Sequence, residues 1–259
     1  MALGVAVANQ DLRYRHNGTM ISKEVFSKFS CKMRLVFLSS GGGGTAKAVH
    51  TLIQNKVTGI FSNQAHIYIL ADRECGATKW AERNSIPNKI INLNQEASWS
   101  QLVNSELINK NDIIITTIHK IIPNNILQAY GKRMINIHYS LLPAFKGMIG
   151  QKTVRSSLEY GSKLLGATCH YVTKEVDGGE PICQVAYAAK SSDLDELTHQ
   201  CYISGCLALI NGISSLHSNN SKNLSPKNTV QCNNIEYMVN PCHADTQKAL
   251  ELLCQRERS

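Results

Sequence analysis

The sequence predicts an α/β fold with a mostly parallel sheet, an antiparallel edge and helices on both faces. Between residues 34 and 138, short apolar runs alternate with amphipathic stretches of about ten residues. Strands that alternate with helices indicate βαβ units, in which the strands pair in parallel. The runs are continuously apolar, as is typical of strands covered on both faces. Further along, two extended segments joined by a short glycine-bearing loop indicate antiparallel pairing.

The first half of the chain holds the alternating elements. Apolar residues recur on one face of each predicted helix, as Ala48, Val49, Leu52 and Ile53 do in the first. Pro87 ends the second helix before the next strand. In chain order, the pattern predicts strands over residues 35–38, 67–70, 89–93, 113–117 and 134–138, and helices over residues 48–53, 77–83, 99–108 and 125–130.

The pattern changes after Pro143. A glycine turn over residues 177–179 separates two strands, and Ser192 with Asp195 has the spacing of a helix N-terminal cap. The pattern predicts helices over residues 151–160, 194–216 and 246–254, and strands over residues 166–172, 181–188 and 235–239.

The chain divides into a core domain and flanking segments. Residues 1–32 show no sustained period, and residues 217–234 are rich in Asn, Ser and Lys without an apolar period. We therefore expect an N-terminal extension at 1–32, a core domain at 33–216, a polar linker at 217–234 and a C-terminal extension of a strand plus a helix at 235–259.

Composition excludes several classes of protein. With 43% apolar residues, 17 Gly and 6 Pro, the chain is neither disordered nor collagen-like. No window approaches the roughly 18 consecutive apolar residues of a membrane-spanning helix. The net charge of +8 is spread thinly, with no block of five like charges, which indicates small anionic ligands or ordinary solubility. We expect no nucleic-acid or membrane partner.

The nine cysteines show no disulfide framework, because their number is odd and their spacing irregular. The weakly apolar N-terminus lacks the basic start of a secretion signal, so we expect a cytoplasmic protein with reduced thiols. Cys201 with Cys206, and Cys242 with His243, come nearest to metal-ligand spacing, but no second pair accompanies them. We therefore expect no metal.

The first feature that suggests chemistry is the glycine turn Gly41, Gly42, Gly43 and Gly44, followed by Thr45, between a strand and a helix. Exposed backbone N–H groups at a helix N-terminus bind anions, and glycines allow a ligand close to the backbone. The turn matches neither dinucleotide nor triphosphate motifs. A merely tight turn is the structural alternative.

The second feature is the pair Asn136 and His138. Residues i and i+2 of a strand point to the same face, so both project together at the carboxyl end of a strand, where open α/β sheets bind ligands. An amide donor beside an imidazole can polarise a carbonyl and stabilise an oxyanion. A structural histidine is the alternative.

The third feature is Asp177, which precedes Gly178 and Gly179 on a loop. A carboxylate placed there can reach across and orient His138. A solvated turn aspartate is the alternative.

Together these residues resemble the 10-formyltetrahydrofolate-dependent formyltransferases, in particular the glycinamide ribonucleotide transformylase branch. The resemblance covers residues 34–216. It lies in Asn-Ile-His-x-Ser-Leu-Leu-Pro-x-Phe-x-Gly over residues 136–147 and Gly-Ala-Thr-Cys-His-Tyr-Val-Thr-Lys-Glu-Val-Asp-Gly-Gly over residues 166–179. The resemblance implies a Rossmann-like formyltransferase fold, a catalytic domain at 33–216, and 10-formyltetrahydrofolate as the co-substrate.

The resemblance also implies roles for individual residues. It assigns catalysis to Asn136, His138 and Asp177. It places the folate beside two loops, with the residues Ile118, His119, Lys120, Ile121, Ile122, Thr173, Glu175 and Val176. It places the amine acceptor beside the glycine turn and the second strand, with the residues Gly41, Gly42, Gly43, Gly44, Thr45, Asp72 and Arg73.

The acceptor side departs from the family pattern. Where the glycinamide ribonucleotide enzymes read Ser-Gly-x-Gly-Ser-Asn, this chain reads Ser-Gly-Gly-Gly-Gly-Thr over residues 40–45. Their Ser-Asn after the second strand is Asp72-Arg73 here. A carboxylate at this position suits an ammonium group and repels a phosphate. In addition, Tyr139 replaces the proline after the catalytic histidine, and Gly205 with Cys206 replaces a Glu-His pair.

These departures favour another small amine as the acceptor. Hydroxyornithine transformylases of siderophore biosynthesis resemble the pattern, since an amino acid would use Asp72 for its ammonium group and Arg73 for its carboxylate. We therefore expect N5-hydroxyornithine or a similar amine. The alternatives are glycinamide ribonucleotide, in purine biosynthesis, and an amino sugar.

Three alternative functions belong to other classes of protein. A formyltetrahydrofolate hydrolase carries an N-terminal regulatory domain, for which 32 residues are too few. A methionyl-tRNA formyltransferase carries a basic C-terminal domain larger than residues 217–259. A non-catalytic folate-binding module would tolerate His138→Ala.

Overall fold

The structure is a computed structural model that describes most of the chain from residue 33 onward. The described residues are 33–57, 65–93, 98–100, 102, 107–118, 120–217, 225 and 227–255, together with strands β1 (Tyr14–His16) and β2 (Thr19–Ile21). These two strands pair antiparallel with each other and form a sheet of their own.

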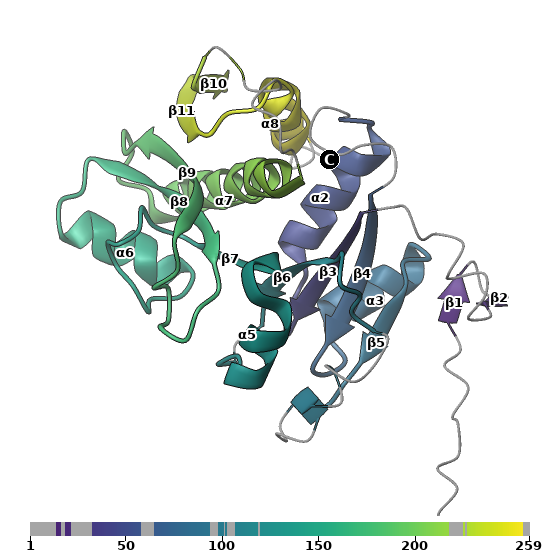
Figure 1. Cartoon of the computed structure of the whole chain (residues 1–259). Coiled ribbons are helices and arrows are strands. Elements are labelled where there is room, and N and C mark those ends of the chain that lie inside the picture. The colour runs from purple at the N-terminus through teal and green to yellow at the C-terminus, as the bar shows by residue number, and fades with distance from the viewer. Residues whose placement is uncertain are drawn as a thin grey trace, which may run out of the picture.

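A nine-stranded mixed sheet organises the described part of the chain, in the order β10-β11-β9-β8-β7-β6-β3-β4-β5 (Figure 1). Strands β5, β4, β3, β6 and β7 run parallel, and β8, β9, β11 and β10 continue the sheet antiparallel. The strands are β3 (Arg34–Ser39), β4 (His66–Ala71), β5 (Asn88–Ile90), β6 (Ile113–Thr117), β7 (Met134–His138), β8 (Leu164–Tyr171), β9 (Pro181–Ala188), β10 (Thr229–Cys232) and β11 (Ile235–Asn240).

Helices cover both faces of the sheet, as expected. They are α2 (Gly44–Gln54), α3 (Gly76–Arg83), α5 (Asn124–Tyr130) with the 3-10 turn η1 (Gly131–Arg133), α6 (Gln151–Glu159), α7 (Leu194–His217) and α8 (Thr246–Gln255). One core cluster joins α2, α3, α6, α7 and α8 to the sheet, and a second joins α5, Trp99 and Leu102 to the opposite face. Strand residues alternate between the clusters, as a period of two requires.

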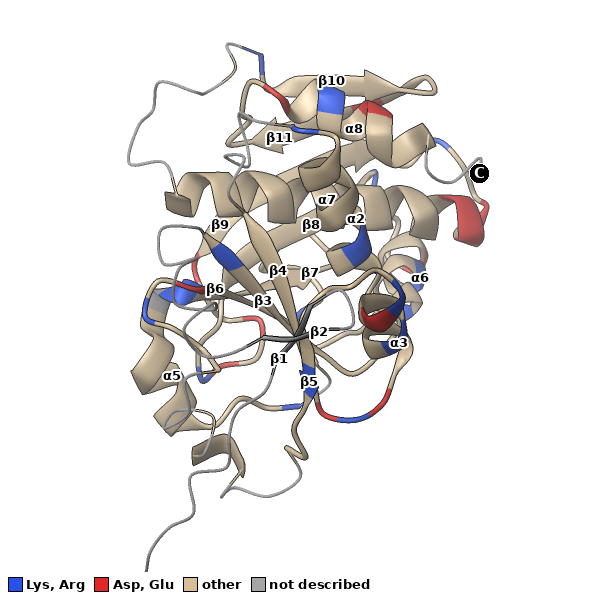
Figure 2. Cartoon of the chain, turned by 90° about the vertical axis from the view of Figure 1, so that its right-hand side faces the viewer, with Lys and Arg blue, Asp and Glu red and all other residues tan. Residues whose placement is uncertain are grey.

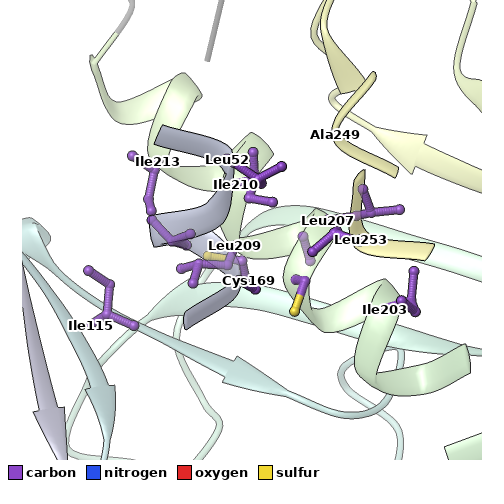
Figure 3. Close-up of a cluster of buried hydrophobic side chains, with 14 of the residues drawn as sticks. Leu52, Ile115, Cys169, Ile203, Leu207, Leu209, Ile210, Ile213, Ala249 and Leu253 are labelled. Carbon is purple, nitrogen blue, oxygen red and sulfur yellow. The ribbon is translucent and has the colours of Figure 1, made fainter. Parts of the chain in front are cut away.

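Helix α7 forms the centre of the larger cluster. Figure 3 shows Ile210 of α7 beside Leu52 of α2, and Leu207 of α7 close to Leu253 of α8; Ile203 belongs to the same cluster. These side chains are almost completely buried. The C-terminal strand pair and α8 therefore belong to the same core as the parallel sheet.

The prediction of a polar linker over residues 217–234 is wrong at both ends of the range. Helix α7 extends to His217, and residues 229–232 form β10. This strand carries no apolar run, so its formation depends on pairing with β11. The side chain of Gln247 also accepts from the N–H of Gln231 at 3.0 Å and donates to its carbonyl at 3.0 Å, which satisfies backbone groups on the outer edge of the sheet.

Among the other differences from the prediction, three have a clear structural reason or extent. In the helix predicted over residues 99–108, Leu107 and Ile108 form a turn and a bend, and residues 101 and 103–106 lie outside the described residues. Strand β5 ends at Ile90, because only Asn88–Ile90 pair with β4. The cap of α7 is Asp193, whose carboxylate accepts from the N–H groups of Asp195 and Glu196, in place of Ser192.

Charged residues are distributed over many elements. In Figure 2, Lys and Arg are scattered along the chain and interspersed with Asp and Glu. None of the described helices offers the apolar length that crossing a lipid bilayer requires.

Candidate active site

His138 and Asp177 meet at the carboxyl end of β7. His138 is the last residue of β7, and its Nδ1 lies 3.1 Å from Oδ2 of Asp177. Both side chains are largely buried, with 5% and 8% exposed. The expected contact between these two residues is therefore present in the structure.

The loop that carries Asp177 is shaped for this contact. Asp177 has φ of 51°, a left-handed conformation that aspartate tolerates better than most residues. A Cβ at Gly179 would lie 1.7 Å from the carbonyl oxygen of Tyr171, so only glycine fits there. The N–H of Gly147 also donates to Oδ2 of Asp177 at 2.8 Å. Oδ2 of Asp177 is thereby in contact with both His138 and the backbone of Gly147.

The second ring nitrogen of His138 also faces an acceptor. Its Nε2 lies 3.0 Å from the carbonyl oxygen of Phe145. A carbonyl and a carboxylate can both be satisfied only when both ring nitrogens carry hydrogen. With both contacts made, neither ring N–H is free, so His138 donates to a substrate oxygen only where that oxygen takes the place of the Phe145 carbonyl at Nε2.

Asn136 lies on the same strand face as His138. Residues Ile135 and Ile137 face the α7 side of the sheet, so Asn136 and His138 face the opposite side. Asn136 is half-buried, and no described residue hydrogen-bonds its side-chain amide. The amide therefore remains available to a substrate oxygen.

Sequence reasoning missed one residue at this site, His170 of β8. His170 pairs with Asn136 across the antiparallel β7–β8 ladder, and its Nε2 lies 3.6 Å from Oδ1 of Asp177. Its Nδ1 donates to the carbonyl of Tyr171 at 2.9 Å, and its Nε2 has no hydrogen-bond partner among the described residues. Burial lowers the pKa of His170. A neutral imidazole therefore borders Asp177 on the side opposite His138.

The residues expected beside the folate differ in their exposure to solvent and in their contacts. Ile121 and Val176 are exposed apolar side chains on the two loops expected beside the folate, whereas the Ile122 side chain belongs to the core. The hydroxyl of Thr173 donates to the backbone carbonyl of Glu175. The side-chain carboxylate of Glu175 forms an ion pair with Nζ of Lys146 at 3.0 Å. Ile118 packs against the same core cluster, Lys120 lies near Asp72, and His119 lies outside the described residues. Only Ile121 and Val176 thus present large apolar side chains to solvent.

The expected acceptor residues lie together at the carboxyl ends of β3 and β4. Gly43 has φ of 70°, and a Cβ there would meet Ala77 at 2.8 Å, so this glycine serves the fold. Gly41 and Gly42 are exposed, and a Cβ at either would meet nothing within 4 Å. In this turn Gly43 is therefore required by the fold, whereas Gly41 and Gly42 leave their backbone open to solvent. Gly44 begins α2, and the adjacent Thr45 is buried.

The cysteine thiols that were expected to serve packing are buried. Cys169 lies on β8 and Cys183 on β9, as predicted. Burial raises the pKa of Cys169 and of Cys201 to about 12, so both thiols stay protonated. Within the described ranges, no three His, Cys, Asp or Glu side chains gather in an arrangement that could hold a metal ion.

Most of this region matches a known protein family. Residues 33–201 match the family described as formyl transferase. The chain is 29% identical over 173 residues to a chloroplastic phosphoribosylglycinamide formyltransferase of Arabidopsis thaliana, covering 64% of this chain and 58% of that protein. It is 34% identical over 116 residues to the mitochondrial formyltetrahydrofolate deformylase 1 of the same plant, covering 44% and 35%. The chain thus covers less than two thirds of either relative.

A solved structure shares the fold. The phosphoribosylglycinamide formyltransferase of Brucella melitensis aligns with a TM-score of 0.62 at 25% identity, over 73% of this chain and 97% of that one. This similarity confirms the mixed-sheet α/β fold expected from the sequence.

Proposed function

The chain belongs to the formyl transferase family, and on that premise we propose that it moves a formyl group from 10-formyltetrahydrofolate to the amine of a small metabolite. The observation that supports this best is the contact of 3.1 Å between His138 and Asp177, with Asn136 on the same strand face. The chemistry needs a donor pair aimed at one oxygen, and these residues supply an amide and an imidazolium.

In the proposed reaction, the acceptor amine attacks the formyl carbon and forms a new carbon–nitrogen bond. The formyl oxygen gains negative charge, which the Asn136 amide and the His138 imidazolium stabilise, each by about 3 kcal/mol. The bond from the formyl carbon to folate N10 then breaks. The amine loses one proton and N10 gains one, and the pair of His138 and Asp177 can pass it between them. Asp177 faces Nδ1 of His138 and so orients the ring toward the oxygen.

The acceptor best supported is glycinamide ribonucleotide, as in purine biosynthesis, because relatives and solved structures of that activity match the chain. Adjacent strands lie about 4.8 Å apart, so the glycine turn after β3 is two strands and about 10 Å from His138. An acceptor with an amine at one end and a phosphate roughly 11 Å away spans this distance. N5-hydroxyornithine separates its two nitrogens by roughly 6 Å, which is too short.

Hydrolysis of 10-formyltetrahydrofolate is the second candidate, because a formyltetrahydrofolate deformylase is among the relatives. In that reaction water takes the place of the amine, and the same three residues serve it. The two reactions differ only in whether an amine is needed for release of the folate. A cytoplasmic location is part of our proposal, although the two plant relatives are named as chloroplastic and mitochondrial.

Turnover of 10-formyltetrahydrofolate with a panel of amines tests the proposal. The panel contains glycinamide ribonucleotide, N5-hydroxyornithine, an amino-sugar nucleotide and a reaction without amine. We expect turnover with glycinamide ribonucleotide. We expect His138→Ala to lower kcat by about 100-fold or more while the Kd of a folate analogue changes little. The exposed His217→Ala serves as the matched control.

Two results would contradict the proposal. Equal release of folate with and without amine would identify a hydrolase. Full activity of His138→Ala would exclude a catalytic role for His138, whereas folate binding without any turnover by the wild-type protein would indicate a folate-binding module.

A further inference from the structure

Three charged side chains join two loops at the carboxyl edge of the parallel strands. Asp72 and Arg73 follow β4, and Lys120 follows β6. Oδ2 of Asp72 lies 3.4 Å from Nη1 of Arg73 and 3.9 Å from Nζ of Lys120. The carboxylate is only 4% exposed, whereas Arg73 is 62% and Lys120 24% exposed. A buried anion thus lies between two cations that reach solvent.

The topology places this cluster beside the glycine turn. Strand β3 lies between β4 and β6 in the sheet, so the contact between Asp72 and Lys120 passes over the end of β3. The chain after β3 continues into Ser40 and the glycine turn. Nη2 of Arg73 donates to the carbonyl oxygen of Ser40 at 3.2 Å. The two cations therefore flank the turn that the proposed acceptor would occupy.

Two buried oxygen atoms at this place have no hydrogen-bond partner among the described residues, Oδ1 of Asp72 and Oγ of Ser40. Buried polar atoms are nearly always paired, so an unpaired one indicates a ligand or a water molecule. Helix α2 begins here without a side-chain cap and without an acidic residue in its first turn. The three charged side chains sum to +1. The Ser40 hydroxyl, the two cations and the start of α2 therefore suit an anion, whereas Oδ1 of Asp72 can only accept a hydrogen bond and needs a donor such as a water molecule.

Resting on the proposed function, we propose that Asp72 is a positioning residue for the anionic end of the acceptor. It holds Arg73 and Lys120 on either side of the glycine turn, so that both cations face the phosphate. Asp72 acts through these cations and does not itself bind the acceptor. This role differs from the one expected from the sequence, in which its carboxylate receives an ammonium group.

The two roles predict opposite effects of Asp72→Asn. Removal of a negative charge that merely lies near the anion would tighten phosphate binding, because repulsion disappears. Loss of the group that positions two cations weakens binding, because both side chains regain freedom. The sign of the change therefore decides between them.

The experiment measures the Kd of inorganic phosphate by calorimetry, and KM and kcat with glycinamide ribonucleotide, at constant ionic strength set with chloride. For Asp72→Asn we expect the Kd and the KM to rise about tenfold, with kcat within about twofold. The matched control is Glu82→Gln, which removes an exposed carboxylate from α3 and leaves all three values unchanged. Unchanged or tighter phosphate binding by Asp72→Asn would overturn the proposal.

A second set of variants keeps the test valid if Asp72→Asn folds poorly. Arg73→Gln and Lys120→Gln each weaken phosphate binding, and Asp72→Asn adds little when both cations are already removed. Wild-type affinity in both single variants would also overturn the proposal. If the wild-type protein transfers formyl to no amine but Asp72→Asn still weakens phosphate binding, the proposed function fails and the role of Asp72 stands.

Discussion

At the residue scale, the buried imidazole of His170 links the site to solution pH. Its pKa is lowered from the ordinary value of 6.5, mainly by burial. The Tyr171 carbonyl and Asp177 raise this pKa, and His138 and Lys146 lower it. The net direction means that the folded protein binds this proton less readily than the unfolded chain.

His170 therefore makes stability depend on pH. As the pH falls below about 6.5, the unfolded chain takes up the proton first, so the free energy of unfolding decreases. We expect His170→Gln to flatten this decrease. Urea unfolding of both proteins between about pH 7.5 and pH 5 measures it. Equal slopes for the two proteins would contradict the buried neutral state.

His243 is a second buried histidine whose pKa shift makes the free energy of unfolding decrease as the pH falls. Burial lowers its pKa too, and its Nε2 lies 3.2 Å from Oγ of Ser215. We expect His243→Gln to flatten the slope independently, so that the double variant is flatter than either single one. The exposed His217→Gln serves as the control.

At the element scale, two glycines on α7 allow the helix to lie close to the sheet. A Cβ at Gly205 would lie 2.6 Å from Cε1 of Tyr139, and a Cβ at Gly212 would lie 2.6 Å from Sγ of Cys169. Tyr139 directly follows His138. Two departures from the family pattern, Tyr139 and Gly205, are therefore one packing arrangement: the tyrosine ring occupies the space that the glycine leaves.

The two glycines form a matched pair for mutation. Alanine improves helix propensity by about 1 kcal/mol, but overpacking costs about 1–3 kcal/mol, so we expect both variants to lose stability in urea unfolding. Gly205→Ala also displaces Tyr139, so we expect a lower kcat. Gly212→Ala is expected to keep wild-type kcat. Adding Cys169→Ala to Gly212→Ala removes the clashing Sγ, so we expect the double variant to regain stability. Equal kcat in both glycine variants would show that Tyr139 does not position His138.

At the scale of the whole molecule, the C-terminal strands and α8 complete the core of the domain. Seven apolar side chains of this C-terminal segment are buried, namely Val230, Tyr237, Val239, Cys242, Ala249, Leu250 and Leu253. Burial of a large apolar side chain contributes about 1.5–3 kcal/mol, so the segment supplies on the order of 10 kcal/mol. That is comparable to the roughly 5–15 kcal/mol by which a whole domain is stable.

Deletion of residues 218–259 is therefore expected to abolish cooperative unfolding, although the family match ends at residue 201. Deletion of residues 1–32 is expected to leave Tm and kcat close to wild type, because β1 and β2 pair only with each other among the described strands. Calorimetry on both truncated chains measures this difference. A cooperative transition at the wild-type Tm after the C-terminal deletion would contradict it.

Prediction from the sequence succeeded where the signal is local. The parallel strands and α2, α3 and α5 follow from apolar runs and helical spacing within each segment, and β7 and β9 have the predicted bounds. Strand β10 was missed, because its four residues become a strand only through pairing with β11. Asn136, His138 and Asp177 were proposed as site residues from motifs, but His170 was not, because its place beside Asp177 depends on the β7–β8 register.

The sequence by itself determined the order of the elements, the residue types of the candidate site and the family, because short-range periodicity and motifs are properties of contiguous residues. The tertiary structure alone decided which charges meet. Asp72, read from the sequence as a ligand for an ammonium group, lies between Arg73 and Lys120, since β3 separates β4 from β6 in the sheet. A charge acts through its neighbours in space, and only the folded sheet defines those neighbours.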